Sequence, residues 1–160
     1  MKETYGDLVK LAKEGKFDVL VQGCNCFQTQ GKGIAKQVKE TFPLVYQADR
    51  EFGEAGDYNK LGCYSYAAMK LEGGKSLFGV NAYTQYDYWS PGDPGNKVYV
   101  DYVAVRLVFR KIKKGLGGKG LKFGIPLIGA GLAKGDWRVI STIIEEEMAG
   151  EDLTLVRYEA

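Results

Sequence analysis

The sequence predicts an α/β sandwich built around a largely parallel sheet. Segments typical of strands alternate with segments typical of helices along most of the 160 residues. Residues 18–25 (DVLVQGCN) form a short run rich in Val and Leu, which fits a strand buried on both faces. The order of buried strand, glycine-rich loop and helix also occurs twice, around residues 18–42 and 122–148.

The other elements follow from local patterns. Further strands are predicted at residues 62–69, 76–81, 122–126 and 153–158. Helices are predicted at residues 8–15, 34–42, 44–52, 100–112 and 137–148. The helix at 100–112 rests on apolar residues at helical spacing, namely Val100, Val103, Ala104, Leu107, Val108 and Ile112. Residues 82–97 are expected to form a long loop.

Composition indicates an ordinary globular protein with one domain, residues 1–160. Apolar residues make up 45% of the chain and charged residues 26%, and the net charge is +2. This charge gives no case for binding nucleic acid or an acidic membrane surface. There is no apolar run long enough to span a bilayer, and the N-terminus lacks the apolar core of a signal peptide. We expect a cytoplasmic monomer with no membrane partner.

Two absences narrow the chemistry. The chain has no His, which excludes Ser-His and Cys-His nucleophile pairs and any imidazole metal site. It has three cysteines, Cys24, Cys26 and Cys63, too few for a four-thiolate zinc site. We expect all three to be small, buried and reduced. We expect no bound metal and no cofactor.

The two glycine-rich loops are the most informative feature. The first, residues 26–33, follows the strand at 18–25, and the second, residues 127–135 (LIGAGLAKG), follows the strand at 122–126. Each places backbone N–H groups and a helix N-terminus at the carboxyl end of a strand, where phosphates bind. The loops contain neither a Walker A motif nor a dinucleotide GxGxxG motif. Two such loops facing one crevice predict a diphosphate ligand.

These segments resemble the macro domain family. Residues 19–43 (VLVQGCNCFQTQGKGIAKQVKETFP) are similar to its first ligand loop, and residues 126–148 (PLIGAGLAKGDWRVISTIIEEEM) to its second. The resemblance covers nearly the whole chain, and it is greatest to the branch of ADP-ribose 1″-phosphate phosphatases and terminal ADP-ribose glycohydrolases. It implies a three-layer α/β/α sandwich with a mixed, mostly parallel six-stranded sheet. It also implies ADP-ribose or ADP-ribose 1″-phosphate as ligand, and nucleic acid only as an ADP-ribosylated substrate.

The resemblance assigns ligand contacts by position. Asp7 matches the acid that accepts from the adenine amino group, and Leu8 the adjacent backbone contact. Asn25 matches the residue near the distal ribose, and Tyr158 an aromatic that stacks on adenine. The first loop supplies Gly31, Lys32, Gly33 and Ile34, and the second supplies Ile128, Gly129, Ala130, Gly131 and Leu132.

Each assignment has a structural alternative. Asp7 can cap the short helix that follows it, and Asn25 can be a turn former. Tyr158 can be a packing residue, and Lys32 an exposed loop lysine. The glycines can serve only tight turns. The aromatic residues Tyr83, Tyr86, Tyr88 and Trp89 fit either a lid over the ligand or a local packing cluster.

The sequence indicates the ligand more clearly than it indicates a catalytic mechanism. A functional His of the phosphatases is replaced by Gln22, and an Asp of the glycohydrolases by Ala133. The glycohydrolase lysine has no counterpart in residues 80–85 (VNAYTQ). Asn25 and Asp136 are the remaining catalytic candidates, although Asp136 also fits a helix N-cap. We expect slow dephosphorylation of ADP-ribose 1″-phosphate, with a non-catalytic ADP-ribose-binding module or a de-ADP-ribosylating hydrolase as alternatives.

Overall fold

The computed structural model describes residues 1–160, whose six strands form one sheet in the order β1-β6-β5-β2-β4-β3. All neighbouring strands are parallel except β4 and β3, which are antiparallel. The strands are β1 (Lys2–Gly6), β2 (Val19–Cys24), β3 (Tyr64–Lys70), β4 (Ser76–Tyr83), β5 (Lys122–Ile125) and β6 (Asp152–Tyr158). The predicted mixed, mostly parallel six-stranded sheet is therefore confirmed.

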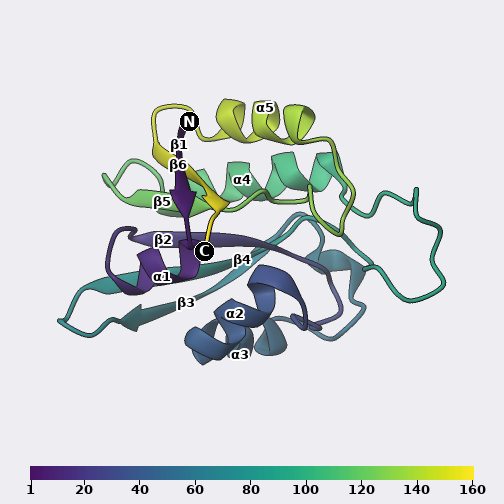
Figure 1. Ribbon diagram of the computed structural model, residues 1–160, viewed down its shortest axis with the longest axis horizontal. Coiled ribbons are helices and arrows are strands. Elements are labelled where there is room, and N and C mark those ends of the chain that lie inside the picture. The colour runs from purple at the N-terminus through teal and green to yellow at the C-terminus, as the bar shows by residue number, and fades with distance from the viewer.

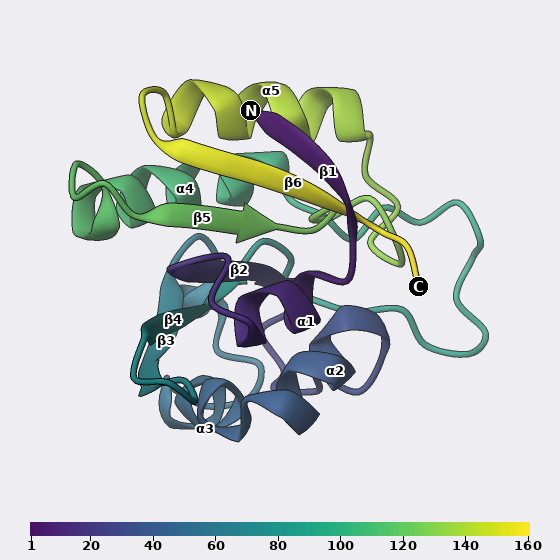
Figure 2. The same cartoon turned by 60° about the vertical axis from the view of Figure 1, so that its left-hand side comes forward.

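Helices cover both faces of this sheet, which gives the predicted three-layer sandwich (Figure 1). The helices are α1 (Leu8–Lys13), α2 (Gly33–Thr41), α3 (Pro43–Glu51), α4 (Tyr102–Leu116) and α5 (Trp137–Glu147), with a 3₁₀ turn η1 (Tyr58–Lys60). The helices α4 and α5 lie on one face, and α1, α2 and α3 on the other (Figures 1 and 2). No helix has the length and apolar character needed to cross a membrane.

Strand β2 divides the interior into two cores. Val19 and Val21 pack in the cluster that includes α4 and α5, whereas Leu20 packs in the cluster that includes α1, α2 and α3. Because successive side chains of a strand point to opposite faces, a strand between two helical layers must be apolar on both. The continuous apolar run at residues 18–25 is explained by this position.

The predicted strands and helices form, with shifted ends, but sequence patterns missed β1. The residues Lys2 to Tyr5 are all exposed, so this strand shows no apolar alternation. It pairs with only one neighbour, β6, at the edge of the sheet. Strand β1 is stabilised by backbone pairing, which does not require a particular pattern of side chains in the sequence.

The predicted buried face of the helix at 100–112 was partly wrong. Val103 and Leu107 are exposed, 67% and 39% respectively, while Val105 and Phe109 are buried. Val100 lies before the helix and pairs with Gln85 in an isolated bridge. The helix begins after Asp101, whose side chain accepts a hydrogen bond from the Ala104 N–H. The cap sets the helix start, and packing against the sheet and α5 buries Val105 and Phe109 in place of Val103 and Leu107.

The strand order places the two glycine-rich loops side by side. Strands β2 and β5 are parallel neighbours, so their carboxyl ends lie at the same edge of the sheet. From β2 the chain continues to α2 on one face, and from β5 to α5 on the other. Figure 2 shows β5 and β6 running toward the edge where the long loop between β4 and α4 projects. Open α/β sheets bind ligands where neighbouring connections diverge in this way.

Glu147, at the end of α5, connects this helix to α4. Its carboxylate accepts hydrogen bonds from Arg106 Nη1 at 2.7 Å and from Arg110 Nε at 2.9 Å. The Arg110 guanidinium, with a contribution from Arg106, holds the pKa of the Glu147 carboxyl below its ordinary value of 4.5.

We expect the Glu147→Gln variant to unfold at a lower urea concentration than the wild type at neutral pH. The carboxyl pKa is lower in the folded chain than in the unfolded chain, so the ionised form stabilises the fold. This contribution is complete above pH 4.5 and is lost as the pH falls through the folded-state pKa. Urea unfolding of the wild type and the variant across this pH range measures the contribution. Glu146→Gln is the control, because Glu146 pairs with Arg106 alone and is more exposed than Glu147. A wild-type advantage that persists undiminished in acid would contradict the prediction.

Candidate functional site

A cleft of about 600 Å³ lies at the carboxyl ends of β2 and β5. Its walls are the first loop with the start of α2, the second loop, and part of the loop between β4 and α4. Of the predicted ligand residues, the cleft is lined by Asn25, Gly31, Lys32, Gly33, Ile34, Ile128, Gly129, Gly131 and Leu132. The tertiary structure thus brings both loops to one cavity of a size common for small-molecule sites.

The second loop presents unpaired backbone donors to the cleft. The N–H groups of Gly129, Gly131, Leu132 and Ala133 have no hydrogen-bond acceptor within the chain. All four residues line the cleft. Successive free N–H groups in a loop form an anion-binding concavity, because each carries a partial positive charge.

The first loop adds a second set of donors. The N–H groups of Gly33, Ile34 and Ala35, in the first turn of α2, have no acceptor in the chain. The N-cap residue, Lys32, makes no side-chain capping bond, so no side chain satisfies this helix end. Gly33 has φ of +58°, which glycine adopts without strain. The helix N-terminus is therefore available to an anion in the cleft.

Tight packing explains two glycines of the second loop. A Cβ at Gly135 would lie 2.5 Å from Val100 Cγ1 and 2.6 Å from the Gly129 carbonyl oxygen. Gly129 has φ of +72°, and a Cβ there would lie 2.7 Å from Val100 Cγ2. Close packing therefore requires glycine at these two positions, while Gly131 has open space around its Cβ position.

The cleft contains one cationic side chain and one acidic one. Lys32 borders it, with Nζ 4.4 Å from the centroid of the Trp89 ring across the cavity mouth. Asp49, from α3, borders the inner end and is fully buried. A phosphate in the cleft would therefore meet Lys32 as its only side-chain counter-charge.

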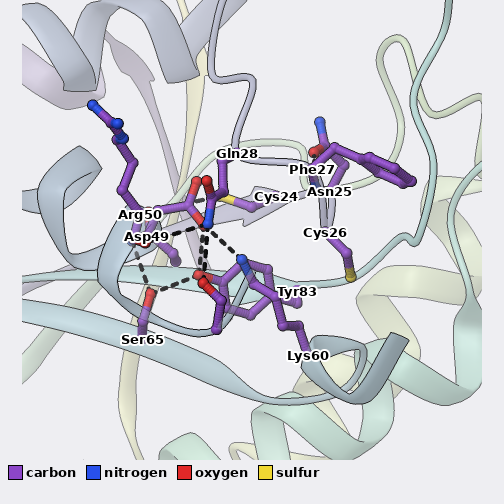
Figure 3. Close-up of polar contacts among 12 residues, drawn as sticks. Cys24, Asn25, Cys26, Phe27, Gln28, Asp49, Arg50, Lys60, Ser65 and Tyr83 are labelled. Carbon is purple, nitrogen blue, oxygen red and sulfur yellow. Dashed lines mark hydrogen bonds and ion pairs between the residues drawn. The ribbon is translucent and has the colours of Figure 1, made fainter. Parts of the chain in front are cut away.

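Asp49 belongs to a buried polar network beneath the cleft (Figure 3). Its Oδ1 accepts from the Tyr83 hydroxyl at 2.7 Å and from Lys60 Nζ at 3.4 Å. Its Oδ2 accepts from Gln30 Nε2 at 2.9 Å. Burial raises the pKa of the Tyr83 hydroxyl, and the carboxylate of Asp49 adds to this shift. Tyr83 therefore remains a hydrogen-bond donor throughout the physiological pH range.

Asn25 forms a turn at the cleft wall. Its Oδ1 accepts from the Phe27 N–H and its Nδ2 donates to Thr29 Oγ1, both at 2.8 Å. The turn-forming alternative is therefore confirmed. Each of its polar atoms still has capacity for one further hydrogen bond. Gln22, by contrast, is buried and donates to Asn81 Oδ1 at 2.9 Å, so this position is committed to the core.

The predicted adenine residues lie outside the cleft lining but on the same edge of the sheet. Asp7 follows β1, and Tyr158 ends β6, paired with Gly6. Asp7 caps α1 by accepting from the Lys10 N–H at 3.0 Å, which confirms the capping alternative. The Leu8 side chain is buried in the core, which leaves its backbone for a ligand contact. Tyr158 is 70% exposed and is not a packing residue.

Asp136 is placed as a helix cap. Its carboxylate accepts from the Arg138 N–H at 2.9 Å and pairs with the Arg138 guanidinium at 3.1 Å. Hydrogen bonding to Arg138 holds the pKa of the Asp136 carboxyl below its usual range, which weakens it as a base. Neither Asp136 nor Ala130 lines the cleft, whereas Ala133 does and has no side-chain chemistry.

The cysteines are free, and two of them are buried. Burial raises the pKa of the Cys24 thiol, and raises that of Cys26 to about 11. Both remain thiols at neutral pH, so neither acts as a thiolate nucleophile. The expectation of burial was wrong for Cys63, which is partly exposed and contacts Lys111 Nζ at 3.3 Å.

Of the four aromatic residues in the segment 83–89, some pack in the protein and others border the cleft. Tyr83 is the buried last residue of β4 and lies in the core. Tyr86 packs edge-on against Phe27 with ring centroids 5.0 Å apart. Tyr88 and Trp89 line the cleft, so only this part of the segment borders a ligand.

Sequence reasoning did not identify Thr29, Gln30, Asp49 or Lys60 as site residues. Asp49 and Lys60 carried no local signal, because charged residues on a helix and beside a turn are usually exposed. Gln30 and Thr29 lie in the first loop, where their proximity to Asn25 was the available signal.

Solved structures with the same fold include macrodomains, whereas no family model matches the sequence. The macrodomain of Thermus aquaticus DarG superposes with a TM-score of 0.66 and 21% identity, over 99% of this chain and 97% of that chain. Thermosipho africanus DarTG in complex with ADP-ribose superposes with a TM-score of 0.67 and 17% identity, over 96% of this chain and 39% of that chain. The protein therefore has the macrodomain fold.

A curated relative from a bacteriophage is similar along its whole length. It is the uncharacterized 17.5 kDa protein in the tk-vs intergenic region of Enterobacteria phage T4, 34% identical over 161 residues. The match covers 99% of this chain and 97% of the phage protein. The chain belongs to the same family as this phage protein.

Two of the three glycines of the second loop, Gly135 and Gly131, provide a test of the packing. We expect Gly135→Ala to lower the free energy of unfolding by about 2 kcal/mol, because its Cβ overlaps Val100 and the Gly129 carbonyl. Gly131→Ala is the matched control and should unfold like the wild type, because its Cβ meets no heavy atom within 4 Å. Urea unfolding of both variants measures this, and equal stabilities would show that the described packing is wrong.

Proposed function

We propose that this protein binds ADP-ribose, or a close derivative, in the cleft between its two glycine-rich loops. The observation that carries the proposal is the convergence of two sets of unpaired backbone N–H groups on one cavity. One set comes from the second loop and the other from the N-terminus of α2. Such donors match the oxygens of a diphosphate, which each accept several hydrogen bonds.

The order of the strands supports an extended ligand. Along the carboxyl edge, β1 and β6 are followed by β5 and then β2. Asp7 and Tyr158 therefore lie at one end, the second loop in the middle, and Asn25 at the other. This order matches adenine, diphosphate and distal ribose in sequence. The ADP-ribose complex of Thermosipho africanus DarTG, 39% of whose chain superposes on this protein, supports the same ligand class.

Dephosphorylation of ADP-ribose 1″-phosphate is the enzymatic form of this proposal, and we infer that any turnover is slow. The resemblance to phosphatase-type macro domains and the position of Asn25 in the cleft support it. The base that would activate water is weak, because Asp136 is committed to Arg138 and Asp49 is buried. Removal of ADP-ribose through a lysine adduct is less favoured, because the only lysine lining the cleft is Lys32 at its mouth.

Calorimetry with ADP-ribose tests the binding proposal directly. We expect saturable binding, and about fivefold weaker binding by Lys32→Met, because one exposed charge contributes on the order of 1 kcal/mol. The affinity of this variant should also depend less on salt concentration. Lys36→Met is the control, because Lys36 lies one turn further along α2 and does not line the cleft. Absence of binding by the wild type at about 1 mM ADP-ribose would refute the proposal.

Phosphate release from ADP-ribose 1″-phosphate tests turnover. We expect a low rate that falls at least tenfold in Asn25→Ala, because this residue lines the cleft. Asp136→Ala should change the rate less than threefold. Because this variant also loses a helix cap, the rates are compared between samples that are equally folded. A rate that is unaffected by Asn25→Ala but abolished by Asp136→Ala would reverse the two roles.

A further inference from the structure

The floor of the cleft is a hydrogen-bond network whose donor and acceptor directions are fixed. The Tyr83 hydroxyl donates its only proton to Asp49 Oδ1. The 2.8 Å contact between Ser65 Oγ and the Tyr83 oxygen must therefore have Ser65 as donor. Asn81 Nδ2 in turn donates to Ser65 Oγ at 3.1 Å. The chain of donors ends at the Asp49 carboxylate (Figure 3).

This carboxylate also fixes the orientation of the Gln30 amide. Gln30 lines the cleft, and its Nε2 donates to Asp49 Oδ2 at 2.9 Å and to Asn81 Oδ1 at 3.3 Å. Because a carboxylate only accepts, the NH₂ group must face Asp49. The Gln30 carbonyl oxygen then has a single long contact, 3.4 Å from Gln22 Nε2, and keeps a free lone pair.

The amide protons of the network are all used within it. Both protons of Gln30 Nε2 are used within the network, as are both protons of Asn81 Nδ2, which donates to Ser65 Oγ and to the Val45 carbonyl. Gln22 Oε1 also lacks a hydrogen-bond partner, but Gln22 is buried and does not line the cleft. The acceptor with a free lone pair on a cleft-lining residue of the floor is therefore the Gln30 carbonyl oxygen, whereas the glycine-rich loops offer donors to phosphates.

Two features show that this arrangement is not the most stable way to fill a core. Lys60 and Asp49 form an ion pair that is almost fully buried, which is commonly no more stable than an apolar pair of the same size. Gln30 has φ of +35°, a conformation that is strained for a residue with a Cβ. Both features are explained if they hold the Gln30 amide at the cleft floor.

We propose that the Gln30 carbonyl oxygen recognises the hydroxyl groups of the distal ribose, and that Asp49 and Lys60 are positioning residues that fix its orientation. The inference rests on the proposed binding of ADP-ribose and deepens it. Gln30 and Asn25 both line the cleft, at the end that the proposed function assigns to the distal ribose. The preferred ligand has free hydroxyl donors on its distal ribose. A phosphate at the distal ribose binds less well, because it is only an acceptor. This preference is consistent with slow turnover of ADP-ribose 1″-phosphate.

The wild-type protein and four ligands test the recognition without any substitution. These are ADP-ribose, ADP-ribose 1″-phosphate, ADP, and ADP esterified with tetrahydrofurfuryl alcohol, which carries the distal ring without hydroxyls. We expect calorimetry to give ADP-ribose at least tenfold tighter binding than the tetrahydrofurfuryl ester, because a buried acceptor left unpaired discriminates strongly. ADP-ribose should also bind more tightly than ADP-ribose 1″-phosphate. Equal binding of ADP-ribose and the ester would overturn the inference and leave the proposed function intact, whereas no binding of ADP-ribose would refute both.

Gln30→Met tests the residue, with Gln28→Met as its matched control. Both glutamines lie in the first loop with positive φ, but Gln28 donates to the carbonyls of Arg50 and Gly53 and does not line the cleft. Gln30→Met should bind ADP-ribose at least tenfold more weakly and ADP within twofold of the wild type. Gln28→Met should keep the wild-type ratio of the two affinities. The same ratio in Gln30→Met would show that Gln30 does not contact the ribose.

The double variant Asp49→Asn/Lys60→Met tests the positioning role while removing both buried charges together. An amide at position 49 can donate to the Gln30 oxygen, which allows the Gln30 amide to turn over and present its NH₂ group. We expect a folded protein whose preference for ADP-ribose over ADP falls at least tenfold and whose relative affinity for ADP-ribose 1″-phosphate rises. A purely structural role for the ion pair would change the melting temperature and leave both ligand preferences unchanged.

Discussion

The parallel pairing of β2 with β5 is the constraint on which the site depends. Strand β2 is buried on both faces, so helices must cover both sides of the sheet. The chain then leaves β2 and β5 toward opposite layers, and the two connecting loops separate at a shared edge. The cleft exists because these loops cannot pack against each other while following helices on different faces.

The two ends of the cleft use opposite hydrogen-bonding chemistry. Around Gly131 and Gly33 the backbone supplies donors, and no particular side chain is needed to hold an anion. At Gln30 a side-chain carbonyl oxygen is the acceptor, and its orientation is fixed by a carboxylate from α3 and a lysine from η1. A ligand with an anionic centre and a hydroxylated end satisfies both. Because the donors belong to the backbone, the side chains present at Gln22 and Ala133 do not alter this set of N–H groups.

The long loop between β4 and α4 links the two parts of the cleft. Its end is tied to the second glycine-rich loop, because the Tyr99 and Val100 N–H groups both donate to the Ala133 carbonyl. Its middle contacts the first loop through Trp89 and Lys32. The two glycine-rich loops, which supply the backbone N–H donors, therefore also hold the long loop at the cleft. The second loop keeps its shape because Val100 packs where Gly129 and Gly135 have no side chain.

The sequence by itself determined the features that depend on local patterns. The apolar run of β2, the two glycine-rich loops and the helix α5 were all predicted, because each leaves a local pattern of residue types in the sequence. The edge strand β1 was missed, since its side chains are exposed and only its backbone pairs. The buried face of α4 was predicted only in part, because apolar residues lie on more than one side of this helix and packing against the sheet and α5 decides which of them are buried. Only the tertiary structure decided that Asp49, Lys60 and Gln30 meet beneath the cleft. Their pairing joins α3, η1 and a loop, and electrostatic attraction between distant residues has no period along a chain.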